Sequence, residues 1–527
     1  MSAERTLIRL SNTMSDTQCS PRADHTSLPT ELWLEIFRYA TYVPRARCIS
    51  PRESFEIQRP FNPLNTPVSS MRTKCSLVLV CQGWRRVSTE LLYEHVVINS
   101  SRRAYLLGRT LESSDLRAAI AGASTSATSE NTTSERGHAR WIRHLEIHTC
   151  SRTSKTAPFW YAIAGILSML PNLHAVSGFW ERPLSKGMLD VFTRYLGESV
   201  RALYWEEGEV PAGEASLLAP TFLTKYRSLR VLDIRKLAFE NSKTVPELGD
   251  TPVVLPGVID LLIPMCPAIM AFATKLSLPA LARLVLDAST ARTRRLSAIP
   301  PALDTLLAVH GPKLTTVELL PVNSLSYASG PVDITTFLQP DVCPQLDTLV
   351  FDCRERVLSA PVISALQQPP QRPPAKSLFS PLPPPTGPPP SDSAPPLNAP
   401  HAALRRVGIR GMGISRLYPN RPTHAQLHLR AFAEQRELFP ALEVVRTLGF
   451  LVDASTDPFA RDIFIWWTEK YESAGLDLQD GEGVVWLYTD PECDESAATE
   501  EQLMAADCVD YVHKSDVEQY NLAKAQA

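Results

Sequence analysis

The sequence predicts an α/β protein in which an N-terminal three-helix block is followed by an irregular α/β solenoid of strand–helix repeats. Apolar residues at helical spacing between residues 28 and 92 indicate the block, and a strand pattern that recurs about every 30 residues from residue 142 indicates the repeats. The composition, 44% apolar and 21% charged, is that of an ordinary globular protein and excludes a wholly disordered chain. One strand and one helix cannot enclose a core, so neighbouring repeats must stack.

The first helix of the block is predicted directly after Leu28-Pro29. Proline favours an extended backbone before it, and Thr30 can cap the helix N-terminus. The residues that follow place an apolar stripe on one helix face. This stripe consists of Leu32, Ile36, Phe37 and Ala40.

Two further helices are predicted after a proline-containing insert at residues 41–73. An apolar stripe from Leu77 to Trp84 indicates one continuous helix. Ser88 predicts the N-cap of a short third helix, and residues 96–98 suit a first strand.

Together the two halves of this block resemble the F-box motif. The matching residues are Leu28-Pro29-x-Glu31-Leu32, Ile36-Phe37, Leu79-Val80-Cys81-x-x-Trp84-Arg85 and Leu91-Leu92-Tyr93. The resemblance implies a substrate-receptor subunit of SCF-type cullin–RING ubiquitin ligases, whose F-box docks on the adaptor subunit of the ligase. It implies these adaptor-binding residues: Leu28, Pro29, Glu31, Leu32, Ile36, Phe37, Val80, Cys81, Trp84, Leu91 and Leu92.

An F-box ordinarily runs without interruption, whereas 33 residues are inserted here at positions 41–73. The entropy of loop closure grows only slowly with loop length, so the insert is compatible with the motif if its two ends lie close together. A helical element of this size cannot turn all its apolar side chains inward, which favours burial against a partner. The alternative is that the block packs on the first repeat as a terminal cap.

The repeat core is L-x-x-L-x-L, with valine or isoleucine at some positions. It starts at residues 142, 229, 281, 314, 346 and 404, with looser copies starting at 170, 200 and 442. Because the interval from 229 to 281 is nearly twice the usual spacing of about 30 residues, we place a degenerate copy near residues 266–273. A strand at 442–451, a helix and a last strand at 483–488 are expected to form a terminal unit.

An F-box followed by such repeats resembles F-box proteins with a leucine-rich-repeat domain that holds the substrate. Strand alternation turns Leu232 and Ile234 into the core and therefore turns Asp233 and Arg235 outward. The outward face carries charges of both signs, which suits a protein or peptide partner more than a phosphate backbone. The predicted substrate-binding residues are Glu146, His148, Asp233, Arg235, Asp287, Glu318, Asp352 and Arg410. A merely solvated sheet surface is the alternative for each of them.

The predicted organisation has five parts. They are a tail at 1–26, an F-box-like domain at 27–98, a connector at 99–140, a leucine-rich-repeat-like solenoid at 141–488 and an acidic tail at 489–527. Many of the 45 prolines lie at 361–400, which is predicted to be an extended insert between two repeats.

Several functional classes are disfavoured. The net charge of −3 gives no global electrostatic reason to expect nucleic acid or an anionic membrane as partner. No catalytic motif is present, and His144 and His148 are better explained as strand residues than as zinc ligands, so no enzyme activity, metal or cofactor is expected. Ten cysteines without a C-x-x-C pair, and no secretory signal, favour the cytoplasm or nucleus. The competing function is a repeat-based protein-binding scaffold without a role in ubiquitin transfer.

Overall fold

A computed structural model describes thirteen parts of the chain. They are residues 28–41, 55, 67–124, 137–149, 157–181, 184–207, 220–237, 253–288, 299–320, 333–353, 399–418, 423–452 and 458–487. The predicted tails at 1–26 and 489–527 and most of the proline-rich insert lie outside these described residues.

Helices and parallel strands alternate along most of the described chain. The helices are α1 (Thr30–Ala40), α2 (Pro67–Val80), α3 (Gln82–Glu94), α4 (Ser101–Ser124), α5 (Ala157–Ser168), α6 (Lys186–Leu196), α7 (Pro220–Leu223), α8 (Pro267–Thr274), α9 (Ile299–His310), α10 (Thr335–Leu338), α12 (Ile414–Leu417), α13 (His424–Glu434) and α14 (Pro458–Ser473), with 3-10 turns η2 (His138–Trp141), η6 (Gly311–Lys313) and η7 (Arg436–Leu438). The strands are β1 (His95–Ile98), β2 (His144–His148), β3 (Ala175–Trp180), β4 (Ala202–Glu207), β5 (Val231–Lys236), β6 (Val253–Val254), β7 (Asp260–Pro264), β8 (Leu276–Ser277), β9 (Arg283–Asp287), β10 (Thr316–Leu320), β11 (Thr348–Asp352), β12 (Arg406–Arg410), β13 (Val444–Leu448) and β14 (Asp477–Gln479).

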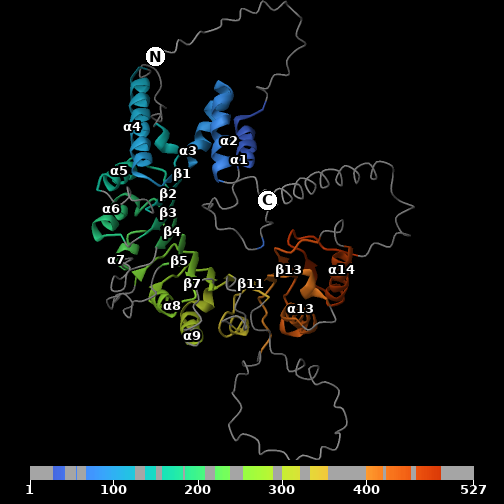
Figure 1. Cartoon of the computed structure of the whole chain (residues 1–527). Coiled ribbons are helices and arrows are strands. Elements are labelled where there is room, and N and C mark those ends of the chain that lie inside the picture. Colours follow the sequence, from blue (N-terminus) through green and yellow to red (C-terminus); the bar gives the residue numbers. More distant parts are fainter. Residues whose placement is uncertain are drawn as a thin grey trace, which may run out of the picture. The chain divides into compact units, whose positions relative to one another are not determined.

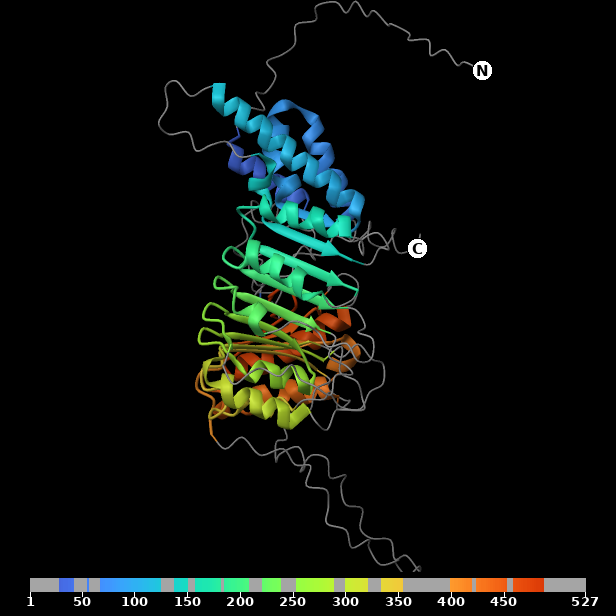
Figure 2. The same ribbon diagram turned by 90° about the vertical axis from the view of Figure 1, so that its left-hand side faces the viewer.

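The fold is α/β, with one sheet of twelve strands among the described residues. Their order is β1-β2-β3-β4-β5-β7-β9-β10-β11-β12-β13-β14, which is almost the order of the sequence, and β6 pairs separately with β8. Contacts divide the chain into two compact units, residues 1–49 with 61–177 and residues 50–60 with 178–527. In the second unit α8 and α9 lie on one side of the strands (Figure 1). This side faces the viewer in Figure 2. No described helix has the length and apolar character needed to cross a bilayer.

The three predicted helices of the N-terminal block are present, with different boundaries. Pro29, not Thr30, occupies the N-cap position of α1, and it has no side chain that can accept a hydrogen bond. The helix expected to run through Cys81 breaks there, because the Cys81 thiol accepts a hydrogen bond from the Trp84 N–H and caps α3. Ser88 is therefore not a cap but a buried residue within α3, and its hydroxyl donates to the Trp84 carbonyl.

The two ends of the insert meet. The Ser70 hydroxyl, in the first turn of α2, donates a 2.7 Å hydrogen bond to the carbonyl of Thr41, which directly follows α1. Both residues are buried. The condition that the insert must satisfy to leave the helical block intact is therefore met, and α2 begins at Pro67, six residues before the predicted end of the insert at 73.

Strands occur at nine predicted copies of the repeat core, but the predicted positions of the degenerate copy and of the last strand were wrong. The degenerate copy is not at 266–273, which forms α8, but at β7, where Val258-x-x-Leu261-x-Ile263 fits the same pattern. The final strand is β14, directly after α14, and the described residues 483–487 are not a strand.

The core of the second unit contains a ladder of apolar residues in register. Each member lies opposite the next on the neighbouring parallel strand and is fully buried. The ladder is Leu203, Leu232, Leu261, Leu284, Val317, Leu349, Val407, Val445 and Leu478. The central leucine of each L-x-x-L-x-L copy therefore sets the register, since a shift of one residue would turn it to the opposite face.

A buried carboxyl on β7 predicts a pH-dependent stability. Asp260 is 3% exposed, and its Oδ2 has no hydrogen-bond partner among the described residues. Burial raises its pKa to about 6, although Arg283 opposes the shift. A carboxyl with a raised folded pKa favours folding below its unfolded pKa, and this stability is lost as the pH rises toward 6. Relative to Asp260→Asn, the wild type should lose about 2 kcal/mol between pH 4 and pH 7.

Urea unfolding of the wild type and Asp260→Asn at pH 4, 5, 6 and 7 measures this difference. Asp462→Asn, at an exposed position on α14, is the matched control and should follow the wild type. Parallel pH profiles of the wild type and Asp260→Asn would contradict the prediction.

Candidate functional site

The first candidate surface is an exposed apolar stripe on α1. Leu32, Ile36 and Tyr39 follow one another at helical spacing, and 49%, 47% and 68% of each residue is exposed. A neighbouring stripe of the same helix, Trp33 and Phe37, faces inward. A helix whose apolar residues cover two stripes is ordinarily buried along both, so the outer stripe of α1 is suited to a partner.

The predicted adaptor-binding residues divide into two groups. Phe37 and Leu91 are almost fully buried, at 2% and 3% exposure, and Trp84 and Leu92 are half-buried. The exposed members are Leu28, Pro29, Glu31, Leu32, Ile36, Val80 and Cys81. In the described fold the side chains of Phe37 and Leu91 pack inside the block, and their contact with a partner stays a prediction.

An aromatic cluster explains why Phe37 faces inward. Its ring lies 5.6 Å from Trp33 and 4.8 Å from Trp84, and the two tryptophans are 5.1 Å apart. Such pairs of offset or tilted rings add to the free energy of burial. The cluster joins α1 to α3 and so fixes the outer stripe of α1 in position.

The second candidate surface is the charged face of the sheet in the second unit, opposite the apolar ladder. Arg235 donates to both carboxylate oxygens of Asp233, at 3.0 and 2.8 Å. Although burial opposes the shift, these hydrogen bonds raise the pKa of the Arg235 guanidinium, and the charges of Asp287 and Glu318 act in the same direction. Four of the predicted substrate-binding residues are therefore brought together electrostatically.

Glu318 is the centre of this charged face. Its carboxylate accepts a 2.7 Å ion pair from Arg283 on the preceding strand and a hydrogen bond from Arg410, two strands further along. Asp352 lies on β11, between the strands of Glu318 and Arg410, and it is also buried. Glu318 is thus paired with two arginines, and Asp352 is buried between their strands.

These residues face away from the apolar ladder, as the alternation of strand residues predicted, but they are not a solvated surface. Asp233, Asp287, Glu318 and Asp352 are all buried. Parallel strands are about 4.8 Å apart, so side chains on one face of the sheet contact those of the adjacent strands. Acidic and basic residues therefore pair between strands and are not exposed to solvent. Glu146 and His148 lie in the first unit and pair with each other.

Two cations of this face were missed. Arg283 is not among the predicted substrate-binding residues. It directly precedes Leu284 of a repeat core, and strand alternation places it on the same face as Asp287. Arg446 was also omitted, and it lies opposite Gln479 in register and donates to its side-chain oxygen. Strand alternation applied to every copy of the repeat would have found both.

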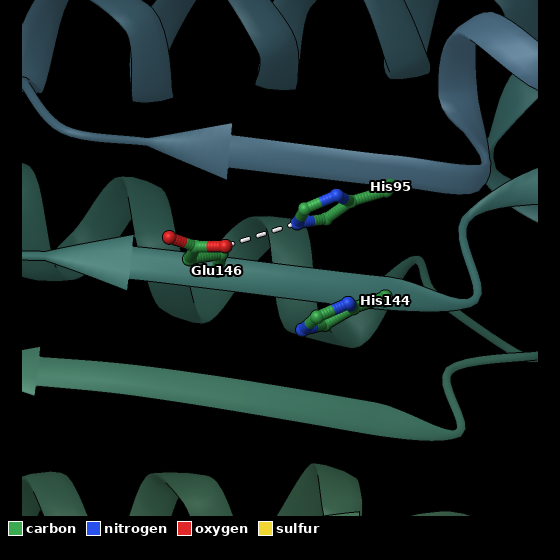
Figure 3. A group of neighbouring side chains, drawn as sticks. All are labelled: His95, His144 and Glu146. Atoms are coloured by element: carbon green, nitrogen blue, oxygen red, sulfur yellow. Dashed lines mark hydrogen bonds and ion pairs between the residues drawn. The ribbon is translucent and has the colours of Figure 1, made fainter. Parts of the chain in front are cut away.

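A cluster of histidines and one carboxylate lies on β1 and β2 of the first unit (Figure 3). Glu146 accepts hydrogen bonds from His95 at 3.0 Å and from His148 at 2.6 Å. His144 is bonded to Ser177 at 2.8 Å, and its ring is stacked on that of His95 with centroids 4.3 Å apart and planes at 9°. The stack follows from the register, in which His95 and His144 are opposite.

The donor atoms of His95, His144 and Glu146 lie within 4.8 Å of one another. A tetrahedral zinc ion needs ligand atoms about 3.4 Å apart with lone pairs that converge. Stacked imidazoles hold their in-plane lone pairs parallel, so one ring would have to turn before both could bind one ion. The arrangement fits a hydrogen-bonded network around one carboxylate better than a metal centre, and the expectation that no metal is bound stays a prediction.

No family model matches this sequence, and no curated protein matches it significantly.

The Glu146 network predicts a loss of stability in acid. Although burial opposes the shift, hydrogen bonds from His148 and His95 lower the pKa of Glu146 well below its ordinary 4.5. A depressed folded pKa contributes stability above the unfolded pKa, and that stability is lost as the pH falls below it. We expect Glu146→Gln to cost about 1.5–3 kcal/mol at pH 7 and less near pH 3.

Denaturant unfolding at both pH values measures this effect. Glu112→Gln, at an exposed position on α4, is the matched control. An equal cost of Glu146→Gln at pH 7 and pH 3 would show that the ionised carboxylate does not contribute.

Proposed function

We propose that this chain is the substrate-recognition subunit of an SCF-type E3 ubiquitin ligase, working in the cytoplasm or nucleus. The helical block would dock on the adaptor subunit, and the strand–helix repeats, in the arrangement of an irregular leucine-rich-repeat-like solenoid, would hold a protein substrate. The chain itself would not be catalytic. It would act by proximity, because tethering raises the effective concentration of substrate lysines near the conjugating enzyme.

One observation carries the proposal: the exposed residues of the F-box-like motif form an apolar stripe that the block leaves open. Leu32 and Ile36 belong to the motif and face outward on α1, while Phe37 and Trp84 hold that helix against α3. The Ser70–Thr41 hydrogen bond supports the same proposal, because it holds the two ends of the insert together and leaves the three helices in contact.

The scaffold alternative is favoured by a different observation. Helix α3 leads directly into β1, and Tyr93 of α3 stacks on His138 of η2 with centroids 4.8 Å apart. The block therefore also packs as a cap on the start of the sheet. A cap and a docking element are compatible, so binding of the adaptor distinguishes the two functions.

The double variant Leu32→Ala with Ile36→Ala tests the proposal. Both side chains are exposed, so the fold should tolerate their loss with little change in stability. We expect at least tenfold weaker capture of the purified SCF adaptor subunit in a pull-down, because truncation of central apolar contacts commonly costs more than about 1.4 kcal/mol.

The matched control is Tyr105→Ala with Leu106→Ala, which removes two comparably exposed apolar side chains from α4. It should capture the adaptor like the wild type. Trp84→Ala is a poorer test, since it also breaks the aromatic cluster. If the wild-type chain captures no adaptor, the proposal is wrong and the scaffold function remains.

A further inference from the structure

Phe55 occupies a defined place on the charged sheet face of the second unit. Its backbone carbonyl accepts a 2.7 Å hydrogen bond from Nη1 of Arg446 on β13. The guanidinium carbon of Arg446 lies 5.0 Å from the centre of the Phe55 ring, and that of Arg406 on β12 lies 5.6 Å from it. Residues 50–60 belong to this unit by their contacts, although in sequence they fall between α1 and α2.

Both arginines are held in place by the sheet. Arg406 forms an ion pair of 2.9 Å with Asp347, which precedes β11. Arg446 donates from Nε and Nη2 to the side-chain oxygen of Gln479, at 3.0 and 2.6 Å, which leaves Nη1 for the Phe55 carbonyl. The two cations are therefore fixed before any ligand arrives, and a preorganised site loses less entropy on binding.

One glycine gives the Arg446 guanidinium its space. Gly483 has φ +87, and a Cβ there would come within 2.9 Å of Nη2 of Arg446. The Arg446 guanidinium is partly removed from water. This burial lowers its pKa, and it strengthens the attraction of the guanidinium to the face of an aromatic ring.

The site contacts two features of Phe55 at once. The arginine pair attracts the face of its ring, and Nη1 of Arg446 donates a hydrogen bond to its backbone carbonyl. A free aromatic metabolite does not offer a peptide carbonyl at that position, whereas any chain segment with a phenylalanine does. In the sequence, Glu53 and Glu56 are the charged residues nearest to Phe55 on either side, which complements two arginines, while Arg52 and Arg59 lie further from it.

We infer that Arg406 and Arg446 form a binding site for linear peptides that carry an aromatic residue beside acidic residues, and that Phe55 occupies this site as an internal competitor. The inference deepens the proposed function by naming a class of substrate, and it rests on that function only in calling the peptide a substrate. Because the internal segment is tethered, it competes at an effective concentration on the order of millimolar. A substrate must displace it.

The test uses a fluorescent peptide with the sequence of residues 50–60, SPRESFEIQRP, and the full-length chain. Fluorescence anisotropy should show at least about tenfold tighter binding to Phe55→Ala than to the wild type, because the variant vacates the site. The same peptide with alanine in place of its phenylalanine should bind neither chain.

Variants in the Phe55→Ala background identify the binding residues. Arg446→Lys keeps the charge but loses the planar fork, and it should weaken peptide binding at least tenfold. Arg405→Ala removes an exposed neighbouring arginine and should bind like Phe55→Ala alone. Circular dichroism and thermal unfolding confirm that each variant is folded.

Three outcomes would overturn the inference: equal binding of the peptide to wild type and Phe55→Ala, equal binding of the peptide that lacks phenylalanine, or unchanged binding to Arg446→Lys. Adaptor capture is measured on the same proteins. If Phe55→Ala binds the peptide but captures no adaptor, the ligase function fails and the peptide site stands.

Discussion

The described fold depends on the lateral register of its parallel strands. From Leu203 to Leu478 one buried apolar side chain on each strand lies opposite the next, and the sequence returns to this position at every repeat. The register also determines the opposite face, because residues on either side of the ladder residue are brought against their counterparts on adjacent strands. The ion pairs of Glu318 and the fixed position of Arg446 follow from it.

The same constraint explains why the charged face is a poor place for free, solvated side chains. Acidic and basic residues that alternate along the sequence become neighbours across strands, and they satisfy each other at a cost in desolvation that only paired charges can offset. Specificity on such a face then comes from the few groups with a donor or a surface to spare. Arg446 is one, since Gln479 takes two of its N–H groups and a third reaches Phe55.

The helical block solves a different problem with the same residue types. Trp33, Phe37 and Trp84 provide its interior, and their packing leaves Leu32 and Ile36 outside. In the motif these side chains look equivalent, because every one of them is apolar and falls at helical spacing. Only the packing of α1 against α3 separates a core residue such as Phe37 from a candidate docking residue such as Ile36.

The sequence alone determined the fold class and the position of ten of the fourteen described strands, because a period of two within a strand and a recurring leucine core are local signals. It did not determine the break at Cys81, which depends on a thiol that accepts a backbone hydrogen bond, or which motif residues are buried. The meeting of Ser70 with Thr41 and of Phe55 with Arg446 joins residues separated by 29 and 391 positions. Such contacts arise from the folded chain in space, and no periodicity in the sequence encodes them.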